Sequence, residues 1–148
     1  MQYFEDLQIG GVRETGTHTM DKAEIIAFAK EFDPQPFHID EEAAKQSIYG
    51  GLIASGWHTA ACTMRLLVDS IAGRTASLGS PGFDNLRWLK PVRPGDTLRA
   101  RSTCIEKIES RSKPDIGICK FNIEVFNQAG DLVMSLTSIA MYRRRPKP

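Results

Sequence analysis

The sequence predicts an α+β fold in which an antiparallel sheet wraps around a long central helix. Residues 57–71 carry apolar side chains at helical spacing, which predicts the helix. Three later segments, 97–109, 119–125 and 132–142, alternate apolar and polar residues, as strands with one buried face do. A long helix followed by consecutive strands favours a sheet packed against that helix.

A strand and a helix are expected at the start of the chain. Residues 12–20 are rich in threonine, which favours an edge-like strand with Gly16 as a candidate bulge. We expect His18 to be a surface residue of this strand. A helix should begin after Asp21, with Glu24 completing a capping box three residues later.

Two prolines shape the segment that follows. Pro34 lacks an N–H and clashes with the preceding turn, so the helix must end at Asp33. Pro36 stiffens the turn. A second, short helix is predicted over 40–47, because acidic residues occupy its first turn. The central helix is apolar on most of its circumference and ends near Gly73, so we expect it to be buried on most sides.

The strands that follow the central helix are separated by recognisable turns. Residues 75–89 predict a strand that is interrupted at 79–82 by glycine, serine and proline. The stretch 90–96 is a turn with two prolines, and 127–131 is a hairpin connection. Three or four antiparallel strands are therefore expected after the helix.

Composition and length describe an ordinary globular protein. The 148 residues fit one domain spanning 1–148, because this is the commonest domain size. The formal net charge of +1 gives no electrostatic case for a nucleic acid partner. No apolar run approaches the ~20 residues of a membrane span, and the N-terminus lacks the features of a signal peptide. We expect a cytoplasmic protein with no membrane attachment.

The cysteines give no indication of a disulfide or a metal. There are three, Cys62, Cys104 and Cys119, at wide spacings and without a C-x-x-C motif. The three histidines scattered among them complete no zinc pattern. We expect reduced thiols in the core and no bound metal.

Asp33 and His38 lie on either side of the proline turn, and two interpretations of them are open. A stiff bend holds a carboxylate and an imidazole face to face with little entropy left to lose, so the two groups can activate a water molecule together. Alternatively, Asp33 only ends the helix and His38 only makes a polar contact.

Gly56, at the start of the central helix, also has two interpretations. A helix N-terminus presents free N–H groups and the positive end of a dipole, and glycine lets a ligand approach the backbone closely. Such an N–H suits an acyl carbonyl oxygen on which negative charge develops. Alternatively, the glycine only permits the turn.

Three stretches carry a resemblance to a known family. Asp-Pro-Gln-Pro-Phe-His-Ile-Asp at 33–40 resembles the signature D-x-N-P-x-H-x-D of the MaoC-like dehydratases, the family of (R)-specific enoyl-CoA hydratases. Gly-Gly-Leu-Ile-Ala-Ser-Gly at 50–56 is similar to the family's segment that ends in His-Gly. Residues 83–96 resemble a stretch of the family in which a strand is followed by the motif K-P-V and then by G-D. The resemblance covers residues 21–142.

The resemblance implies a hot-dog fold, an antiparallel sheet wrapped around a long central helix and paired into a homodimer or a dimer of dimers. It also implies acyl thioester substrates, mostly of coenzyme A. Asp33 and His38 would activate the water that adds to a 2-enoyl thioester. The Gly56 N–H would polarise the thioester carbonyl, with Ser55 and Trp57 beside it in the substrate site. No metal or redox cofactor is required.

Some positions depart from the family pattern. Gln35 replaces the usual asparagine, and Ser55 replaces the histidine that often precedes the glycine. A serine found in some members falls near Met64, with Thr63 beside it. Trp57 and His58 either line the substrate pocket or pack against the protein. The length and branching of the acyl group therefore stay open.

Two other functions share the implied fold. A hot-dog thioesterase usually acts with a carboxylate on the long helix, where this chain offers only Asp69. A non-catalytic acyl-CoA-binding subunit would not need the Asp33 and His38 pair. The phosphates of coenzyme A could contact the basic tail at 143–147 or the basic residues between the strands, although solvated surface positions are the alternative for all of them. These inter-strand residues are Arg87, Lys90 and Arg93.

Overall fold

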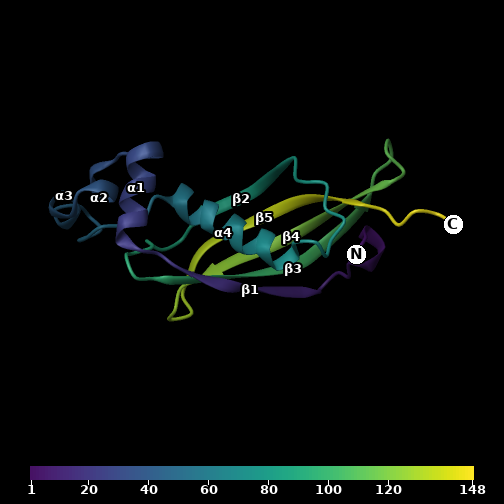
Figure 1. Ribbon diagram of the computed structural model, residues 1–148, viewed down its shortest axis with the longest axis horizontal. Helices are drawn as coiled ribbons and strands as arrows, with labels where there is room; N and C mark the ends of the chain where they lie inside the picture. Colours follow the sequence, from purple (N-terminus) through teal and green to yellow (C-terminus); the bar gives the residue numbers. More distant parts are fainter.

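The structure, a computed structural model, describes residues 1–148 (Figure 1). Several helices gather at one end of a curved sheet, and the longest helix runs along the sheet. The elements are, in chain order, η1 Phe4–Asp6, β1 Val12–Thr19, α1 Lys22–Phe32, α2 Pro36–Ile39, α3 Glu41–Lys45, α4 Gly56–Ile71, β2 Gly82–Trp88, β3 Thr97–Glu109, β4 Ile116–Phe126 and β5 Leu132–Arg143. The longest helix, α4, has 16 residues, and none of the helices combines the length and hydropathy that a membrane crossing needs.

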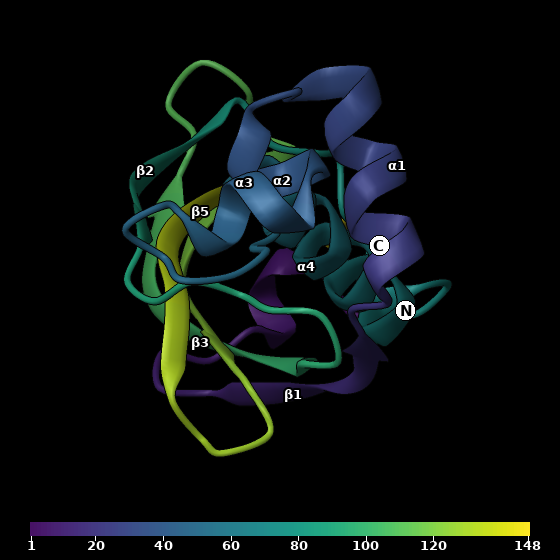
Figure 2. The ribbon, with the colours of Figure 1, turned by 90° about the vertical axis from the view of Figure 1, so that its left-hand side faces the viewer.

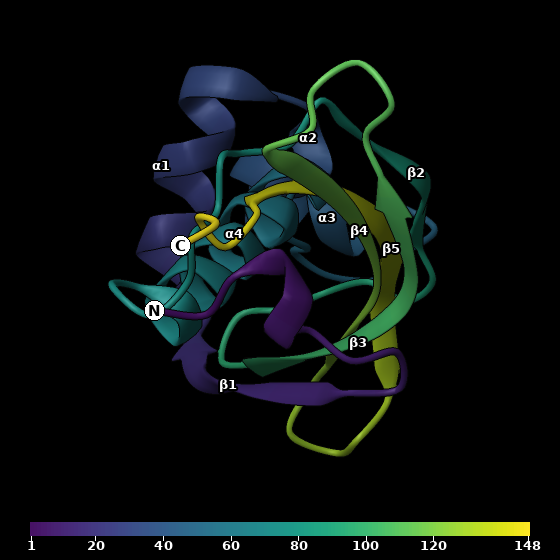
Figure 3. The ribbon, with the colours of Figure 1, turned by 90° about the vertical axis from the view of Figure 1, so that its right-hand side faces the viewer.

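The five strands form one antiparallel sheet in the order β1-β3-β4-β5-β2. The last three strands follow one another as a meander, whereas β1 and β2 form the two edges. Views from the two ends show the sheet curving around α4 (Figures 2 and 3). The predicted α+β fold, with an antiparallel sheet around a long central helix, is therefore confirmed.

The core lies between α4 and the concave face of the sheet. Alternate residues of the central strands point into it, as the period of two requires. These are Leu98, Ala100, Ile123, Val125 and Met134. The register of β1 against β3 shifts between Glu14 and Thr17, which confirms the bulge expected at Gly16.

The start of the chain differs from expectation in two details. The side chain of Asp21 makes no capping hydrogen bond at α1, and the Glu24 carboxylate accepts from His18 instead of from the backbone, so the predicted capping box is wrong. Residues 36–39 form a short helix, α2, that the sequence analysis did not predict. This helix can form because Pro36 fits the first position of a helix.

Two further expectations concern the segments that precede and follow α4. Helix α3 begins at the expected place, with the Asp40 carboxylate accepting from the N–H groups of Glu42 and Ala43 at 3.0 and 3.2 Å. The strand expected over 75–89 is shorter. Residues 75–81 make only isolated bridges at Thr75 and Ser77, and β2 begins at Gly82.

Helix α4 is buried on one side only, so the expectation that it is buried on most sides is wrong for a single chain. Its buried face contains His58, Thr59, Thr63 and Leu66. Thr63 is tolerated there because its hydroxyl donates to the Thr59 carbonyl at 2.8 Å. The apolar side chains of Trp57, Met64 and Val68 are exposed. The apolar stripe that predicted the helix therefore faces partly outward.

Candidate functional site

A cleft of about 460 Å³ is lined by residues of α2, the start of α4 and the end of β2. Figure 2 views the molecule from the end where α2 and the start of α4 lie. The cleft brings together four of the five predicted site residues, which are Asp33, His38, Gly56 and Trp57. The fifth, Ser55, is fully buried at the N-cap of α4. Aromatic and apolar side chains make up much of the remaining wall, including Phe37, Tyr49, Trp88, Leu89 and Val92.

Asp33 is held by two hydrogen bonds, one to each carboxylate oxygen. The Gln35 amide donates to Oδ1 and the Ser55 hydroxyl donates to Oδ2, both at 2.7 Å. Gln35 is close because the proline turn brings its side chain back, and Ser55 arrives with the start of α4. Both departures from the family pattern therefore act on the same carboxylate.

Ser55 links this carboxylate to the central helix. Its hydroxyl donates to Asp33 and accepts from the Trp57 N–H at 3.3 Å. A serine hydroxyl can do both at once, because it has one donor and two lone pairs. Ser55 therefore does not reach the open cleft; it caps α4 and fixes the orientation of Asp33.

The His38 imidazole is buried and has a defined tautomer. Its Nδ1 lies 2.7 Å from the Ile53 carbonyl oxygen, which can only accept, so Nδ1 carries the proton. The other ring nitrogen, Nε2, lies 3.3 Å from Asp33 Oδ2. In the neutral ring, this nitrogen presents a lone pair towards the carboxylate.

The surroundings of Asp33 favour its ionised form. Burial acts to raise the pKa of this carboxyl, but the hydrogen bonds from Gln35 and Ser55, together with the charge that His38 can carry, outweigh it and hold the pKa below its usual value of 3.8. Asp33 is therefore a carboxylate at neutral pH. A carboxylate and an imidazole lone pair can together accept hydrogen bonds from both O–H groups of one water molecule.

Gly56 is required by the packing of Trp88. A Cβ atom at this position would lie 2.6 Å from Trp88 Cδ2 and 2.7 Å from its Nε1. The indole N–H donates to the Gly56 carbonyl at 2.9 Å, and the ring contacts Trp57 edge to face. The Gly56 N–H begins α4 and has no acceptor within the protein, as expected for the first N–H of a helix. This N–H is available to a ligand.

The basic residues differ in how near they lie to the cleft. Lys90 lines it and pairs with Asp131 at 2.9 Å. Arg93 donates to the Tyr49 carbonyl at its edge. Within one chain the basic tail lies at the opposite end of the molecule (Figure 1), where Arg144 and Arg145 pair with acidic residues of η1.

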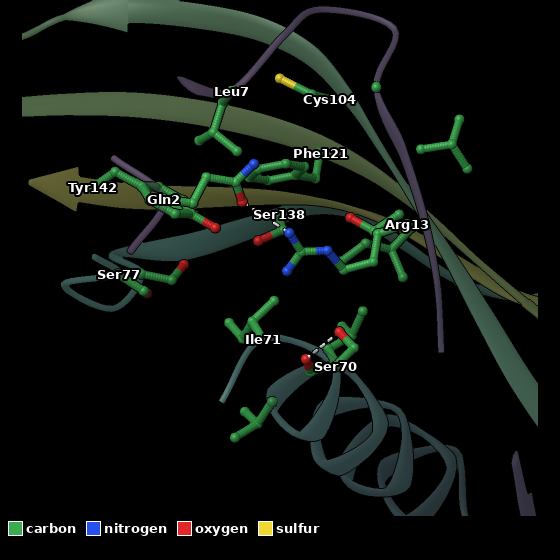
Figure 4. A pocket seen from close by; sticks show the side chains of 18 of the residues that line it. Gln2, Leu7, Arg13, Ser70, Ile71, Ser77, Cys104, Phe121, Ser138 and Tyr142 are labelled. Atoms are coloured by element: carbon green, nitrogen blue, oxygen red, sulfur yellow. Dashed lines mark hydrogen bonds between the residues drawn. The ribbon is translucent and has the colours of Figure 1, made fainter. Parts of the chain in front are cut away.

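A second cavity, of about 360 Å³, lies between the far half of α4 and the sheet (Figure 4). Its wall is mainly apolar, with Ile71 and Phe121 among the side chains that line it. Arg13 reaches into it and donates to Gln2 at 2.9 Å. This cavity shares no lining residue with the cleft and contains no carboxylate.

A polar cluster on another side of α4 was not found from the sequence. Glu24 accepts hydrogen bonds from His18 at 2.9 Å and from His58 at 3.1 Å, and the Cys62 thiol lies 3.7 Å from the same oxygen. His58 therefore does not line the cleft, where it had been considered for substrate contact. No local motif indicates the cluster, because its members come from β1, α1 and α4.

Comparison with known proteins identifies the family to which the chain belongs. Residues 6–120 match the family described as "MaoC like domain". A solved structure of the MaoC-like dehydratase from Rhodospirillum rubrum has a TM-score of 0.91 and 45% sequence identity, and the match covers 99% of this chain and 100% of that one.

Two curated relatives lie further away in sequence. The chain is 30% identical over 112 residues to the 3-hydroxybutyryl-CoA dehydratase of Methylorubrum extorquens, covering 75% of this chain and 69% of that protein. It is 36% identical over 107 residues to Protein MaoC of Klebsiella aerogenes, covering 72% of this chain but only 31% of that protein. With most of its length matched, this chain belongs to the MaoC-like family and has its hot-dog fold.

Proposed function

We propose that the protein is a hydro-lyase that reversibly adds water to a 2-enoyl-CoA, or removes it from a 3-hydroxyacyl-CoA. One observation carries this proposal: the Asp33 carboxylate and the His38 imidazole face each other across 3.3 Å at the wall of an open cleft. A family relative named as a 3-hydroxybutyryl-CoA dehydratase supports the same class of reaction.

The pair would act on a single water molecule. Asp33 and His38 Nε2 each accept a hydrogen bond from one of its O–H groups, which leaves an oxygen lone pair directed at the substrate. As the oxygen bonds to the β-carbon, one proton passes to the pair, and the pair delivers one proton to the α-carbon. The carbon–carbon double bond is consumed, and the two side chains return to their starting state.

The start of α4 would supply the electrophilic half of the site. During addition the electron pair of the double bond moves towards the thioester carbonyl, whose oxygen gains negative charge. The Gly56 N–H and the positive end of the helix dipole would stabilise that charge. Trp57 and Trp88, beside Gly56, would hold the acyl group near the N–H, and Lys90 would be a partner for the phosphates of coenzyme A.

A thioesterase is the main alternative, and the structure gives it less support. The carboxylate expected on the long helix, Asp69, is exposed and binds Arg65 at 3.0 Å. It is not among the residues that line the cleft. A non-catalytic acyl-CoA-binding subunit would leave the positioned pair of Asp33 and His38 without a role.

We also propose that the protein pairs into a homodimer. The exposed apolar side chains of α4 continue onto β2, because Met64, Val68 and Phe83 line one cavity and Trp57 contacts Trp88. A contiguous apolar face of this kind is uncommon on a monomer. A second copy of the chain would cover it.

Hydration of crotonyl-CoA tests the proposed reaction. The purified protein should remove the absorbance of the conjugated thioester, and Asp33→Asn or His38→Gln should lower kcat by roughly 10²–10⁴-fold, the usual effect of a positioned acid or base. Asp40→Asn is the matched control, because Asp40 belongs to the same segment but caps α3, and asparagine also caps helices. Unchanged hydration in both variants would exclude the assigned roles. Release of free thiol from a saturated acyl-CoA would favour the thioesterase.

A further inference from the structure

The side of α4 away from the cleft brings three metal-binding side chains together. His18 comes from β1, Glu24 from α1 and Cys62 from α4. The ring nitrogen, a carboxylate oxygen and the sulfur lie within 4.8 Å of one another. They line an open pocket between these elements, so an ion from solvent can reach them.

The separations between these atoms are close to those of a tetrahedral metal site. Zinc bond lengths of about 2.0–2.3 Å place neighbouring ligand atoms roughly 3.3–3.8 Å apart. Cys62 Sγ lies 3.7 Å and His18 Nε2 lies 2.9 Å from the same carboxylate oxygen, Glu24 Oε1. The His18–Glu24 distance has to lengthen by a few tenths of an ångström, and the distance from His18 to Cys62 has to shorten by roughly 1 Å. The half-exposed His18 side chain can move by that amount.

His58 forms a hydrogen bond with the Glu24 carboxylate from the buried side of the cluster. Its Nε2 lies 3.1 Å from Glu24 Oε1, whereas its buried Nδ1 has no hydrogen-bond partner. A proton on Nε2 therefore satisfies both groups, since the alternative would bury an unpaired N–H and face a lone pair towards the carboxylate. Such an outer hydrogen bond is typical of carboxylates that bind metals.

We propose that His18, Glu24 and Cys62 bind a divalent transition-metal ion of the zinc class. The three side chains supply nitrogen, oxygen and sulfur, and water from the pocket takes the fourth position. A thiolate and an imidazole favour zinc or cobalt over magnesium and calcium, which prefer oxygen ligands alone. Arg65 is the one cation that lines this pocket, and it is paired with Asp69 at 3.0 Å.

Binding requires one proton to leave. Burial, with the adjacent Glu24 charge, raises the pKa of the Cys62 thiol to about 12, so the sulfur is protonated in the absence of metal. The metal–sulfur bond forms as the S–H bond breaks, and the proton passes to solvent.

A cobalt titration tests the site directly. The tag-free chain, treated with a chelator and then dialysed, is titrated with cobalt(II) chloride. We expect one equivalent to bind, with a cobalt–thiolate charge-transfer band that zinc chloride abolishes. Cys62→Ser should remove the band, His18→Gln should weaken binding by at least about 100-fold, and His58→Gln should weaken it by about 10–100-fold.

Cys104→Ala is the matched control, because Cys104 is a buried thiol outside the cluster and the variant should keep the band. Circular dichroism establishes that each variant is folded, and the wild-type result does not depend on any variant. A wild-type protein with no thiolate band would overturn the proposal. Cobalt binding that is as tight in Cys62→Ser and His18→Gln as in the wild type would also overturn it, because such binding would be only adventitious binding at the surface.

Discussion

Ser55 couples the beginning of α4 to the Asp33 carboxylate, and its loss should act on both. In Ser55→Ala the carboxylate loses one of two hydrogen bonds that stabilise its charge, so its pKa rises. The acidic limb of the pH profile for hydration should then move to higher pH. The activity should fall by roughly tenfold or more, since a hydrogen bond to a charged group contributes about 1.5–3 kcal/mol.

The same substitution should lower the free energy of unfolding by about 0.5–2 kcal/mol, the usual effect of losing an N-cap. Ser70→Ala is a suitable control, because Ser70 lies on the same helix and its hydroxyl donates only to the Leu67 carbonyl. That variant should leave the pH profile where it is. Identical profiles for wild type and Ser55→Ala would show that Ser55 does not position Asp33.

Asp33 should also make the stability of the protein depend on pH. Its pKa is lower in the folded protein than in the unfolded chain, where it is close to 3.8. Its contribution to stability is therefore complete at pH values above the unfolded pKa and is lost as the pH falls through the folded pKa. Urea unfolding of wild type and Asp33→Asn should show a constant difference from pH 7 to about 5 and a smaller one below about pH 4. A difference that stays constant down to pH 3 would contradict the assignment.

Local sequence was sufficient for part of the site. Asp33 and His38 are five residues apart on a turn stiffened by two prolines, so their proximity follows from the backbone alone. Ser55 lies 22 residues from Asp33, and Trp88 lies 32 residues from Gly56, so both contacts depend on how α4 and β2 pack. Sequence spacing contains no record of that packing, and the same is true of the cluster around Glu24.

At the scale of elements, the contact between α4 and β2 determines the cleft wall. In Gly56→Ala the new Cβ would overlap the Trp88 ring, which must move and give up its hydrogen bond to residue 56. We expect a loss of about 1–3 kcal/mol in the free energy of unfolding and a change in tryptophan fluorescence. Hydration of crotonyl-CoA should fall as well, because the helix N–H shifts with the ring.

Gly82→Ala provides the comparison, since Gly82 lies on the same strand as Trp88 and an added Cβ would contact nothing within 4 Å. Its fluorescence and stability should stay close to those of the wild type. If Gly56→Ala behaves in the same way, the glycine is not required by the packing of Trp88.

The elements themselves were predicted unequally. The strands β3, β4 and β5 follow directly from alternating side chains, because a period of two fixes which face is buried. The apolar stripe of α4 predicted a helix but not what covers each side. Two threonines, Thr59 and Thr63, are buried while Met64 and Val68 are exposed, since the helix has a sheet on one side only. Apolar periodicity does not distinguish a face covered by the same chain from one that a second chain would cover.

At the scale of the whole molecule, that uncovered face makes the oligomeric state measurable. We expect the protein to sediment with twice the mass of one chain. Val68→Glu should shift the equilibrium to monomer, because a charge buried in an apolar interface without a partner is strongly unfavourable. Ile48→Glu is the matched control, since Ile48 is 94% exposed and lies outside the face formed by α4 and β2.

Sedimentation velocity over a range of concentrations separates the outcomes. A dimer in the wild type and in Ile48→Glu, with a monomer in Val68→Glu, would place the interface on α4. The monomer would also reveal whether the cleft needs its partner, because Asp33, His38 and Gly56 all come from one chain. Hydration that persists in monomeric Val68→Glu would show a self-sufficient site. A wild-type monomer, or a Val68→Glu dimer as stable as the control, would contradict the proposed interface.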